Sequence, residues 1–322
     1  MEHFSADEFS QPDRQAHNAF MLDLPAHLEP IARQLAELQG RGRPYQTAQA
    51  RIALLRHTLA QLEEPFACSP ETYAALQREL AVAYQDDVST ERSQHMEAAL
   101  LACEAALEVY TLVYYPYQYA SLQITQGNIY RERIAQAQRE NLERAIACYR
   151  EALQYFTLKD FPYEYAQVQQ ELGQVYQLRV EGKRPENIEL SIDYCLQALR
   201  IYTGQDWPVE HAKTLHILGT AYVRRLTGDR RENLEQAIAY YQQAAAIFAP
   251  EMFPMEYGKT QNNLAAAYSQ RISGEQRDNI EQAIACYRRA LRVCTLQTFP
   301  TEYANYQNNL GIAYWQRVMG EA

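Results

Sequence analysis

The stretch NLERAIACY at residues 141–149 recurs three times along the chain, as NIELSIDYC from residue 187, NLEQAIAYY from residue 233 and NIEQAIACY from residue 279. Each step is 46 residues (187 − 141 = 46), and stepping back by the same interval reaches HMEAALLAC from residue 95 and QARIALLRH from residue 49. Six gapless repeats therefore cover residues 49–322, the last of them two residues short. A repeat of about 20–50 residues indicates a solenoid, in which each unit buries its apolar face against its neighbours.

Each unit is expected to contain two helices, because its apolar positions recur every three or four residues. We expect one helix to begin at the opening Asn, a good N-cap, with the Glu two residues later favouring the positive helix end. The other should begin at a Pro, whose missing N–H needs no partner there, and end near a Gly that stops the helix. These columns are Asn141, Asn187, Asn233 and Asn279; Pro70, Pro116, Pro162, Pro208, Pro254 and Pro300; and Gly182, Gly228, Gly274 and Gly320.

Two further columns are expected to join neighbouring units. An aromatic residue precedes five of the prolines and should pack as a hinge between units. An Arg follows three residues after an invariant Tyr, and we favour a structural salt bridge to a neighbouring repeat over a binding stripe for it. The columns are Tyr115, Phe161, Trp207, Phe253 and Phe299, and Arg133, Arg179, Arg225, Arg271 and Arg317.

The two ends of the chain depart from the repeat. Residues 1–25 lack periodicity and are predicted to form a flexible N-terminal segment, whereas residues 26–322 are predicted to form the solenoid, with repeats from 49, 95, 141, 187, 233 and 279. Residues 26–39 should form a degenerate helix that pairs with the next, so six helix pairs precede a single helix at 301–319. That helix keeps Leu310, Tyr314 and Trp315, so we expect the chain either to be an excised module or to meet another subunit or domain there.

The repeat resembles the tetratricopeptide (TPR) family. Leu264, Ala265 and Tyr268 match one half of its signature, and Ala237, Tyr241 and Ala244 match the other. The repeat is 12 residues longer than the family norm of about 34 (46 − 34 = 12). Long repeats with NLEQAI and FPxEYAxxQNNLGxAY phrases are similar to arrays in bacterial proteins that also carry a caspase-like CHAT peptidase domain. The resemblance implies an all-α, right-handed superhelical solenoid of antiparallel helix pairs.

The resemblance also implies a concave groove lined by the Pro-started helices, and it places a polar set of side chains there. A ladder of carboxamides can grip a peptide backbone, because each carries donors and acceptors. The lysines and arginines would suit an acidic or C-terminal carboxylate ligand. The alternative is that the asparagines are only polar surface. The groove residues are Asn128, Arg131, Gln170, Gln174, Lys213, His216, Arg224, Lys259, Asn262, Asn263, Asn305, Asn308, Asn309 and Trp315.

Composition and motifs disfavour several other classes. The net charge of −10 and the pI near 5.3 argue against nucleic acid and against anionic membranes. No motif of a metal, phosphate or cofactor site is present, so no cofactor, no metal and no enzymatic activity are expected. The six cysteines form no CxxC pair, and most of them are expected to be small core residues, which favours a reducing cytoplasm. Cys68, in a connection, is only a weak candidate for a nucleophile.

The sequence therefore favours a scaffold or sensor module that binds a peptide or partner domain in its groove. By resemblance, the module would regulate an associated effector such as a CHAT-type peptidase. Two alternatives stay open. One is a structural element that self-associates end to end through the helix at 301–319, and the other is a receptor for a peptide signal, for which a helix-turn-helix is missing.

Overall fold

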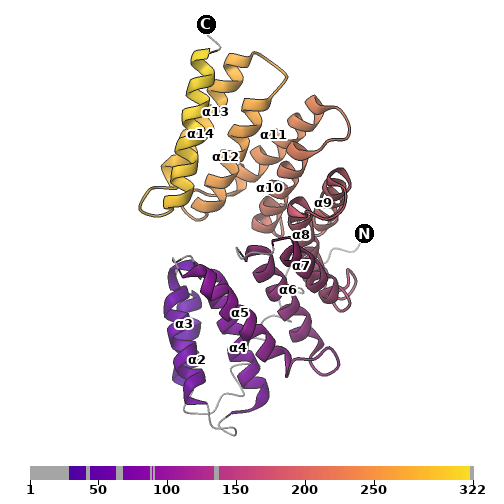
Figure 1. Cartoon of the computed structure of the whole chain (residues 1–322), viewed down its shortest axis with the longest axis vertical. Helices are drawn as coiled ribbons and strands as arrows, with labels where there is room; N and C mark the ends of the chain where they lie inside the picture. The colour runs from indigo at the N-terminus through magenta and orange to yellow at the C-terminus, as the bar shows by residue number, and fades with distance from the viewer. Residues whose placement is uncertain are drawn as a thin grey trace. The chain divides into compact units, whose positions relative to one another are not determined.

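The computed structural model describes residues 29–40, 44–62, 68–87, 89, 91–133 and 138–319. Within these residues the chain forms thirteen α-helices and no strand (Figure 1). The expected flexible segment at 1–25 lies outside the described residues. Within each of its two compact units, consecutive helices pack against each other, so the predicted all-α solenoid of helix pairs is confirmed.

The helices alternate between two kinds. The Pro-started helices are α4 (Pro70–Asp86), α6 (Pro116–Glu132), α8 (Pro162–Leu178), α10 (Pro208–Arg224), α12 (Pro254–Gln270) and α14 (Pro300–Met319). Those that carry the repeated Asn stretch or its counterpart are α5 (Arg92–Leu107), α7 (Gln138–Ala152), α9 (Arg184–Leu199), α11 (Arg230–Ile247) and α13 (Gln276–Val293). Before them, α2 (Glu29–Gly40) packs on α3 (Pro44–Gln61), as expected for the degenerate first pair.

The chain divides into two compact units, residues 1–168 and residues 169–322, and the boundary falls inside α8. Unit 1 contains α2–α7 and the start of α8, and unit 2 contains the remainder of α8 and α9–α14. In both units the closest packing joins a Pro-started helix to the helix that follows it, as in α6 with α7 and α12 with α13.

A close approach of backbone and ring explains why Gly recurs in the Pro-started helices. A Cβ on Gly127 would lie 2.6 Å from the ring of Tyr149, and a Cβ on Gly219 would lie 2.9 Å from the ring of Tyr241. Each Tyr ring, buried at 0–1% exposure, therefore packs directly on the backbone of the preceding helix. No larger residue could stand at these glycines without moving the ring.

The opening Asn of each repeat is not the N-cap that we predicted. The helices start three residues earlier, and Lys183, Asp229 and Glu275 occupy the cap positions of α9, α11 and α13. Each Asn side chain is buried, and in three repeats its Nδ2 donates to a loop carbonyl six residues before it, as Asn233 does to Thr227 O at 2.8 Å. Asn187 and Asn279 do the same to Glu181 O at 2.7 Å and Ser273 O at 2.8 Å.

The predicted helix stop is also wrong at Gly182, Gly228 and Gly274, whereas Gly320 lies outside the described residues. The Pro-started helices α8, α10 and α12 end four residues before the Gly, and α10 and α12 are capped by an Arg with extended backbone. Gly182, Gly228 and Gly274 instead directly precede the next helix's N-cap and have φ of +77°, +74° and +79°. Only Gly adopts this left-handed conformation without a steric cost. The loop thus turns at the Gly and is held by the Asn side chain.

The Arg column forms salt bridges, as predicted, but within a repeat rather than to a neighbouring one: four members each pair with a Glu 36 residues earlier in the same 46-residue repeat. Arg225 holds Glu189 with two bonds of 2.8 and 2.9 Å, and Arg271 holds Glu235 with two bonds of 2.8 Å. The pKa values of these two Glu carboxyls are lowered by their Arg partners. The other pairs are Arg133–Glu97 and Arg317–Glu281.

The aromatic residues before the prolines pack as predicted. Phe161, at the start of α8, lies 5.6 Å from Phe156 and 5.9 Å from Tyr117 of α6, measured between ring centroids. Phe253 lies in the same way 6.1 Å from Phe248, just after α11. These rings fill the junction between the end of one helix pair and the start of the next.

Candidate functional site: a polar face on α10, α12 and α14

The predicted groove residues are spread over five helices, and twelve of the fourteen belong to unit 2. Asn128 and Arg131 lie on α6 in unit 1, and Gln170 and Gln174 lie on α8. The remaining ten lie on α10, α12 and α14, where they fall into columns 46 residues apart. One column is Lys213, Lys259 and Asn305, the next is His216, Asn262 and Asn308, and Asn263 and Asn309 belong to a third.

Four of these side chains are joined in one hydrogen-bonded row, here called the amide chain: Asn309, Asn262, Asn263 and His216. The Nδ2 of Asn309 donates to Oδ1 of Asn262 at 2.9 Å, and Nδ2 of Asn262 donates to Oδ1 of Asn263 at 3.2 Å. The Nδ2 of Asn263 lies 3.3 Å from Nε2 of His216. The amide chain therefore links α14 to α12 and α12 to α10.

The hydrogen bonds around His216 determine its tautomer. The hydroxyl of Thr260 donates to Glu256 O at 2.7 Å, so its oxygen accepts from Nδ1–H of His216 at 2.9 Å. The Nε2 is then unprotonated and accepts from Asn263, which is consistent with the direction of every bond in the amide chain. Burial, with a smaller contribution from the charge of Lys259, lowers the pKa of His216 to about 4. His216 is thus a neutral acceptor near pH 7.

The residues of the amide chain are half-buried, so each has a side that faces solvent. Among the described residues, no protein donor reaches Oδ1 of Asn309, and each Asn amide has a second N–H beyond the one used in the chain. Lys213 and Lys259 are exposed beside the amide chain on α10 and α12, and Asn305 and Asn308 are exposed on α14. The face therefore combines amide donors and acceptors with two cationic side chains.

Several predicted groove residues are instead engaged in packing between helices. Gln170 is buried and its Nε2 donates to Thr214 Oγ1 at 2.6 Å and to Glu210 O at 3.1 Å. Arg224 donates to Gln177 O at 3.3 Å. In unit 1, Asn128 accepts a 2.7 Å bond from the hydroxyl of Tyr149. Gln174 is half-buried, and no side-chain partner reaches it among the described residues.

Threonines and tyrosines that the repeat pattern had not singled out support the face. Thr214 and Thr260 occupy one column and take equivalent bonds from Gln170 and His216, which also share a column. Tyr241 donates to Thr220 at 2.9 Å, just as Tyr149 donates to Asn128. The sequence does contain a sign of these contacts, because polar residues recur 44 residues apart in consecutive units.

Trp315 lies on α14 and is 64% exposed, with Ile312 at 49% and Val318 at 60% near it on the same helix. Arg131 is largely buried, and its Nη2 lies 3.2 Å from Glu132. The predicted residues thus separate into three sets: the amide chain, the exposed polar residues beside it, and residues engaged between helices.

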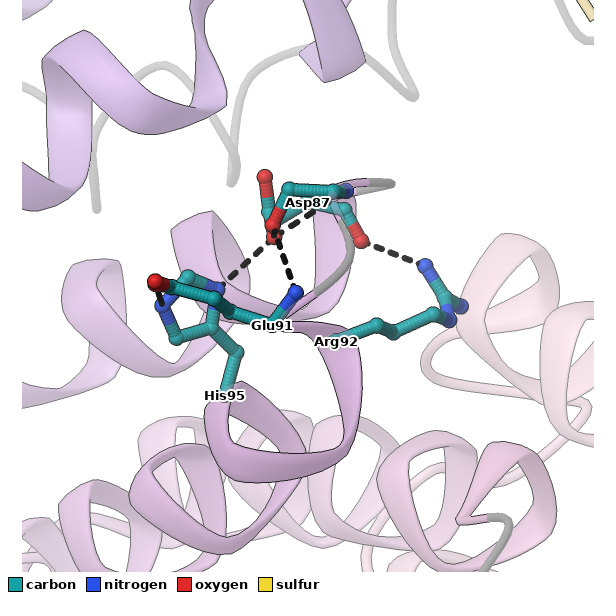
Figure 2. A network of polar contacts seen from close by, with 5 residues as sticks. Asp87, Glu91, Arg92 and His95 are labelled. Atoms are coloured by element: carbon teal, nitrogen blue, oxygen red, sulfur yellow. Dashed lines mark hydrogen bonds and ion pairs between the residues drawn. The ribbon is translucent and has the colours of Figure 1, made fainter.

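Unit 1 contains a second polar cluster, around His95 (Figure 2). The Nδ1 of His95 lies 2.7 Å from Oδ2 of Asp87, and its Nε2 lies 3.5 Å from Glu91. Arg92 donates to Asp87 O at 2.6 Å and to Glu132 of α6 at 2.6 Å. His95 occupies the repeat position that the opening Asn holds in later repeats. The cluster therefore takes the place of the contact by which that Asn side chain binds the preceding loop.

An open hollow beside this cluster is lined by Gln49 and Arg56 of α3 and by Ser89, Glu91 and His95. Its lining mixes charges of both signs, so it does not select a ligand class. No group of three or more potential metal ligands occurs among the described residues, and none of the described helices has the length and apolar character to cross a bilayer.

Five of the six cysteines fill the core, and Cys68 is half-buried. Cys103, Cys195 and Cys294 are each 0% exposed, and Cys195 packs its sulfur where a Cβ on Gly173 would lie 2.6 Å away. Burial raises the pKa of Cys195 to about 12. Burial also raises the pKa of Cys68, the weak nucleophile candidate, which is the opposite of the thiolate activation that a nucleophile needs.

Comparison with known proteins adds no family assignment: no family model matches the chain, and no curated protein matches it either.

Proposed function

We propose that this protein is a TPR-like interaction module and that the polar face of α10, α12 and α14 binds an extended peptide of a partner protein. The observation that carries the proposal is the amide chain. Asn309, Asn262 and Asn263 are held in fixed orientations by one another and by His216, so their remaining donors and acceptors are preorganised. A preorganised row of carboxamides suits a peptide backbone, which offers alternating N–H and C=O groups.

The charge beside the amide chain favours an acidic ligand. Lys213 and Lys259 stand in one column on adjacent Pro-started helices, both exposed. Lys259 is close enough to His216 to lower the pKa of its imidazole, so its charge lies near the amide chain. A carboxylate of the ligand, at a side chain or at its C-terminus, would meet these ammonium groups while its backbone meets the amides.

The buried thiols support a reducing cytoplasm as the compartment, because the cysteines act as small apolar core residues. The associated effector suggested by the repeat, a CHAT-type peptidase, is the first partner to test.

Paired capture experiments test the proposal. One bait is the wild-type chain, the second is Asn263→Ala with Asn309→Ala, and the third is Gln236→Ala with Gln282→Ala. The third removes two exposed carboxamides from α11 and α13 of the same unit and is the matched control. We expect a partner captured by the first and third baits and lost from the second, with folding checked by circular dichroism. Equal capture by all three baits would refute the proposal.

A further inference from the structure

The exposed side of α9 is more apolar than the exposed sides of α11 and α13. Leu190 and Leu196 are 40% and 44% exposed, and Asp193 lies between them, three residues from each, so the three side chains form one row along the helix. The same two leucine positions carry exposed polar side chains in the later repeats, Gln236 and Gln242 in α11 and Gln282 and Arg288 in α13. The repeat itself therefore does not require leucine there.

The charge of α9 also differs from that of its counterparts. Within Arg184–Leu199 three carboxylates are accompanied by one cation, so α9 is net negative, whereas α11 is balanced and α13 is net positive. Two replacements cause the difference. Pro185 and Asp193 stand where α11 has Arg231 and Ala239 and where α13 has Arg277 and Ala285.

The Arg that α9 lacks acts on a neighbouring carboxylate in α11. The hydrogen bonds of Arg271, helped by the charge of Arg231, lower the pKa of Glu235. The counterpart of Glu235 in α9 is Glu189, and Pro185, one turn before it, supplies no charge. An external cation at this place would substitute for one that the later repeats carry themselves.

A hollow of about 430 Å³ opens beside these residues in unit 2. It combines apolar side chains, from Pro185 and Leu190, with three carboxylates. A Lys or Arg side chain fits this combination, because its methylene groups can pack on the apolar residues while its charged end meets the carboxylates. The lining residues are Pro185, Glu186, Glu189, Leu190, Asp193 and Thr227.

Two of the three carboxylates are accessible to a ligand. Glu189 is held by Arg225, whereas Glu186 and Asp193 are exposed. Glu186 forms a surface ion pair with Lys183 at 3.1 Å, and pairs of this kind contribute little to stability. Asp193 accepts a bond of 2.8 Å from Gln197, and a carboxylate can accept several such bonds. Both can therefore receive a cation of a partner.

The rest of the chain does not supply a matching segment. Residues 1–28 are acidic, with Glu2, Asp7, Glu8, Asp13 and Asp23 against Arg14, and residues 320–322 also carry an acid. The other residues outside the described ranges are connections of five residues or fewer between helices of unit 1. Five more helices follow α9, so its exposed side does not depend on where the sequence stops. The net charge of −10 disfavours a second copy and favours a basic partner.

We propose that the exposed side of α9, with Glu186, Leu190, Asp193 and Leu196, binds a basic amphipathic helix of a partner protein. The row of Leu190, Asp193 and Leu196 is a ridge of the kind against which a second helix packs. Apolar residues of the partner cover the two leucines, and its Lys or Arg side chains meet Glu186 and Asp193. This surface is separate from the polar face of α10, α12 and α14, which favours an acidic ligand, so neither proposal depends on the other.

The probe is a fluorescent 14-residue peptide, LKKLLKLLKKLLKL, which forms a basic amphipathic helix. The full chain is titrated to about 1 mM against a trace of the peptide, and anisotropy reports binding. Two variants give α9 the residues of its counterparts and so should keep the fold: Pro185→Arg with Asp193→Ala, and Leu190→Gln with Leu196→Gln. We expect each to weaken binding about tenfold or more, and we expect binding to weaken from about 0.05 to about 0.5 M NaCl.

The matched control is Glu232→Gln with Asp278→Asn. These two exposed acids occupy the position of Glu186 in α11 and α13, and their replacement changes the net charge as much as Pro185→Arg with Asp193→Ala does. The control should leave peptide binding unchanged. An equal loss in the control, no loss in either α9 variant, or no binding at the highest concentration would overturn the proposal. A concentration-dependent mass of the chain alone that the α9 variants remove would assign the surface to a second copy and overturn the proposed occupant.

Discussion

The imidazole of His95 and the carboxylate of Asp87 are hydrogen-bonded at 2.7 Å in the two columns where Asn141 and Arg133 stand one repeat later. In that later repeat Arg133 donates to Asn141 at 3.4 Å and pairs with Glu97. The acidic Asp87 thus stands one repeat before the basic Arg133. The position of Glu97 is likewise taken, one repeat earlier, by a residue of opposite charge, Arg51, which pairs with Asp86 at 2.8 Å.

The Asp87–His95 contact should be energetically coupled. Burial raises the pKa of Asp87, but hydrogen bonds from Ser89 and His95 outweigh it, so the pKa is lowered overall. We expect Asp87→Asn and His95→Ala each to destabilise unit 1, and their effects to overlap by about 1–2 kcal/mol in a double-mutant cycle. Denaturant unfolding of the four chains measures this coupling. Additive losses would show that the two side chains act independently.

The ion pairs of the Arg column should differ in strength with their geometry. The Arg271–Glu235 pair has two short bonds, whereas Arg317 and Glu281 are 3.4 Å apart and more exposed. We expect Glu235→Gln to lower the free energy of unfolding by about 1 kcal/mol and Glu281→Gln by less than about 0.5 kcal/mol. The comparison is made at low and at high salt, where the Glu235 effect should shrink. Equal effects of the two substitutions would contradict the geometric account.

His216 should make the stability of the fold depend on pH. Its pKa is about 4 in the folded chain and near 6.5 when unfolded, so the unfolded chain takes up a proton first as the pH falls. Stability that is present above pH 6.5 should be lost progressively towards pH 4, by at most about 3 kcal/mol. His216→Gln should flatten the profile in this window, whereas His57→Gln, at an exposed position of α3, should not. An unchanged profile in His216→Gln would place the titration elsewhere.

Two glycines of one column should respond to the same substitution with opposite signs. Gly219→Ala places a Cβ 2.9 Å from the ring of Tyr241, so we expect a loss of about 1–3 kcal/mol. Gly311→Ala meets no neighbour, so the better helix propensity of Ala should raise stability by about 0.5–1 kcal/mol. Thermal unfolding of the two variants beside the wild type measures both signs. A gain at Gly219 would show that the close approach is not needed.

The sequence predicted the helices well because their determinants are local and periodic. Each Pro of the repeated column (Pro70, Pro116, Pro162, Pro208, Pro254 and Pro300) begins a helix, and the interval of 46 residues located the Arg column whose members Arg225 and Arg271 form salt bridges. The loops were predicted less well. Asn233 was placed as an N-cap because Asn caps helices often, but its side chain binds Thr227 O, a contact that depends on how the loop folds back.

The polar face was predicted as a set of residues but not as a network. The repeat placed His216, Asn263 and Asn309 on corresponding faces of three helices. Which side chains bond to each other depends on the rotation and offset of neighbouring helices, and the amide chain joins residues 47 apart, one more than the repeat. The same helix geometry places the side chain of Gln170 against α10, where its hydrogen bond supports the packing of α8 on α10.

Photo-crosslinking from the polar face tests the central claim most directly. A photoreactive residue is placed at position 305, which is exposed beside the amide chain, or at position 282, which is exposed on α13. We predict that position 305 crosslinks one protein in a native lysate, that position 282 does not, and that excess wild-type chain competes while the Asn263→Ala, Asn309→Ala chain does not. Crosslinking of the same protein from both positions, or equal competition by both chains, would contradict the account.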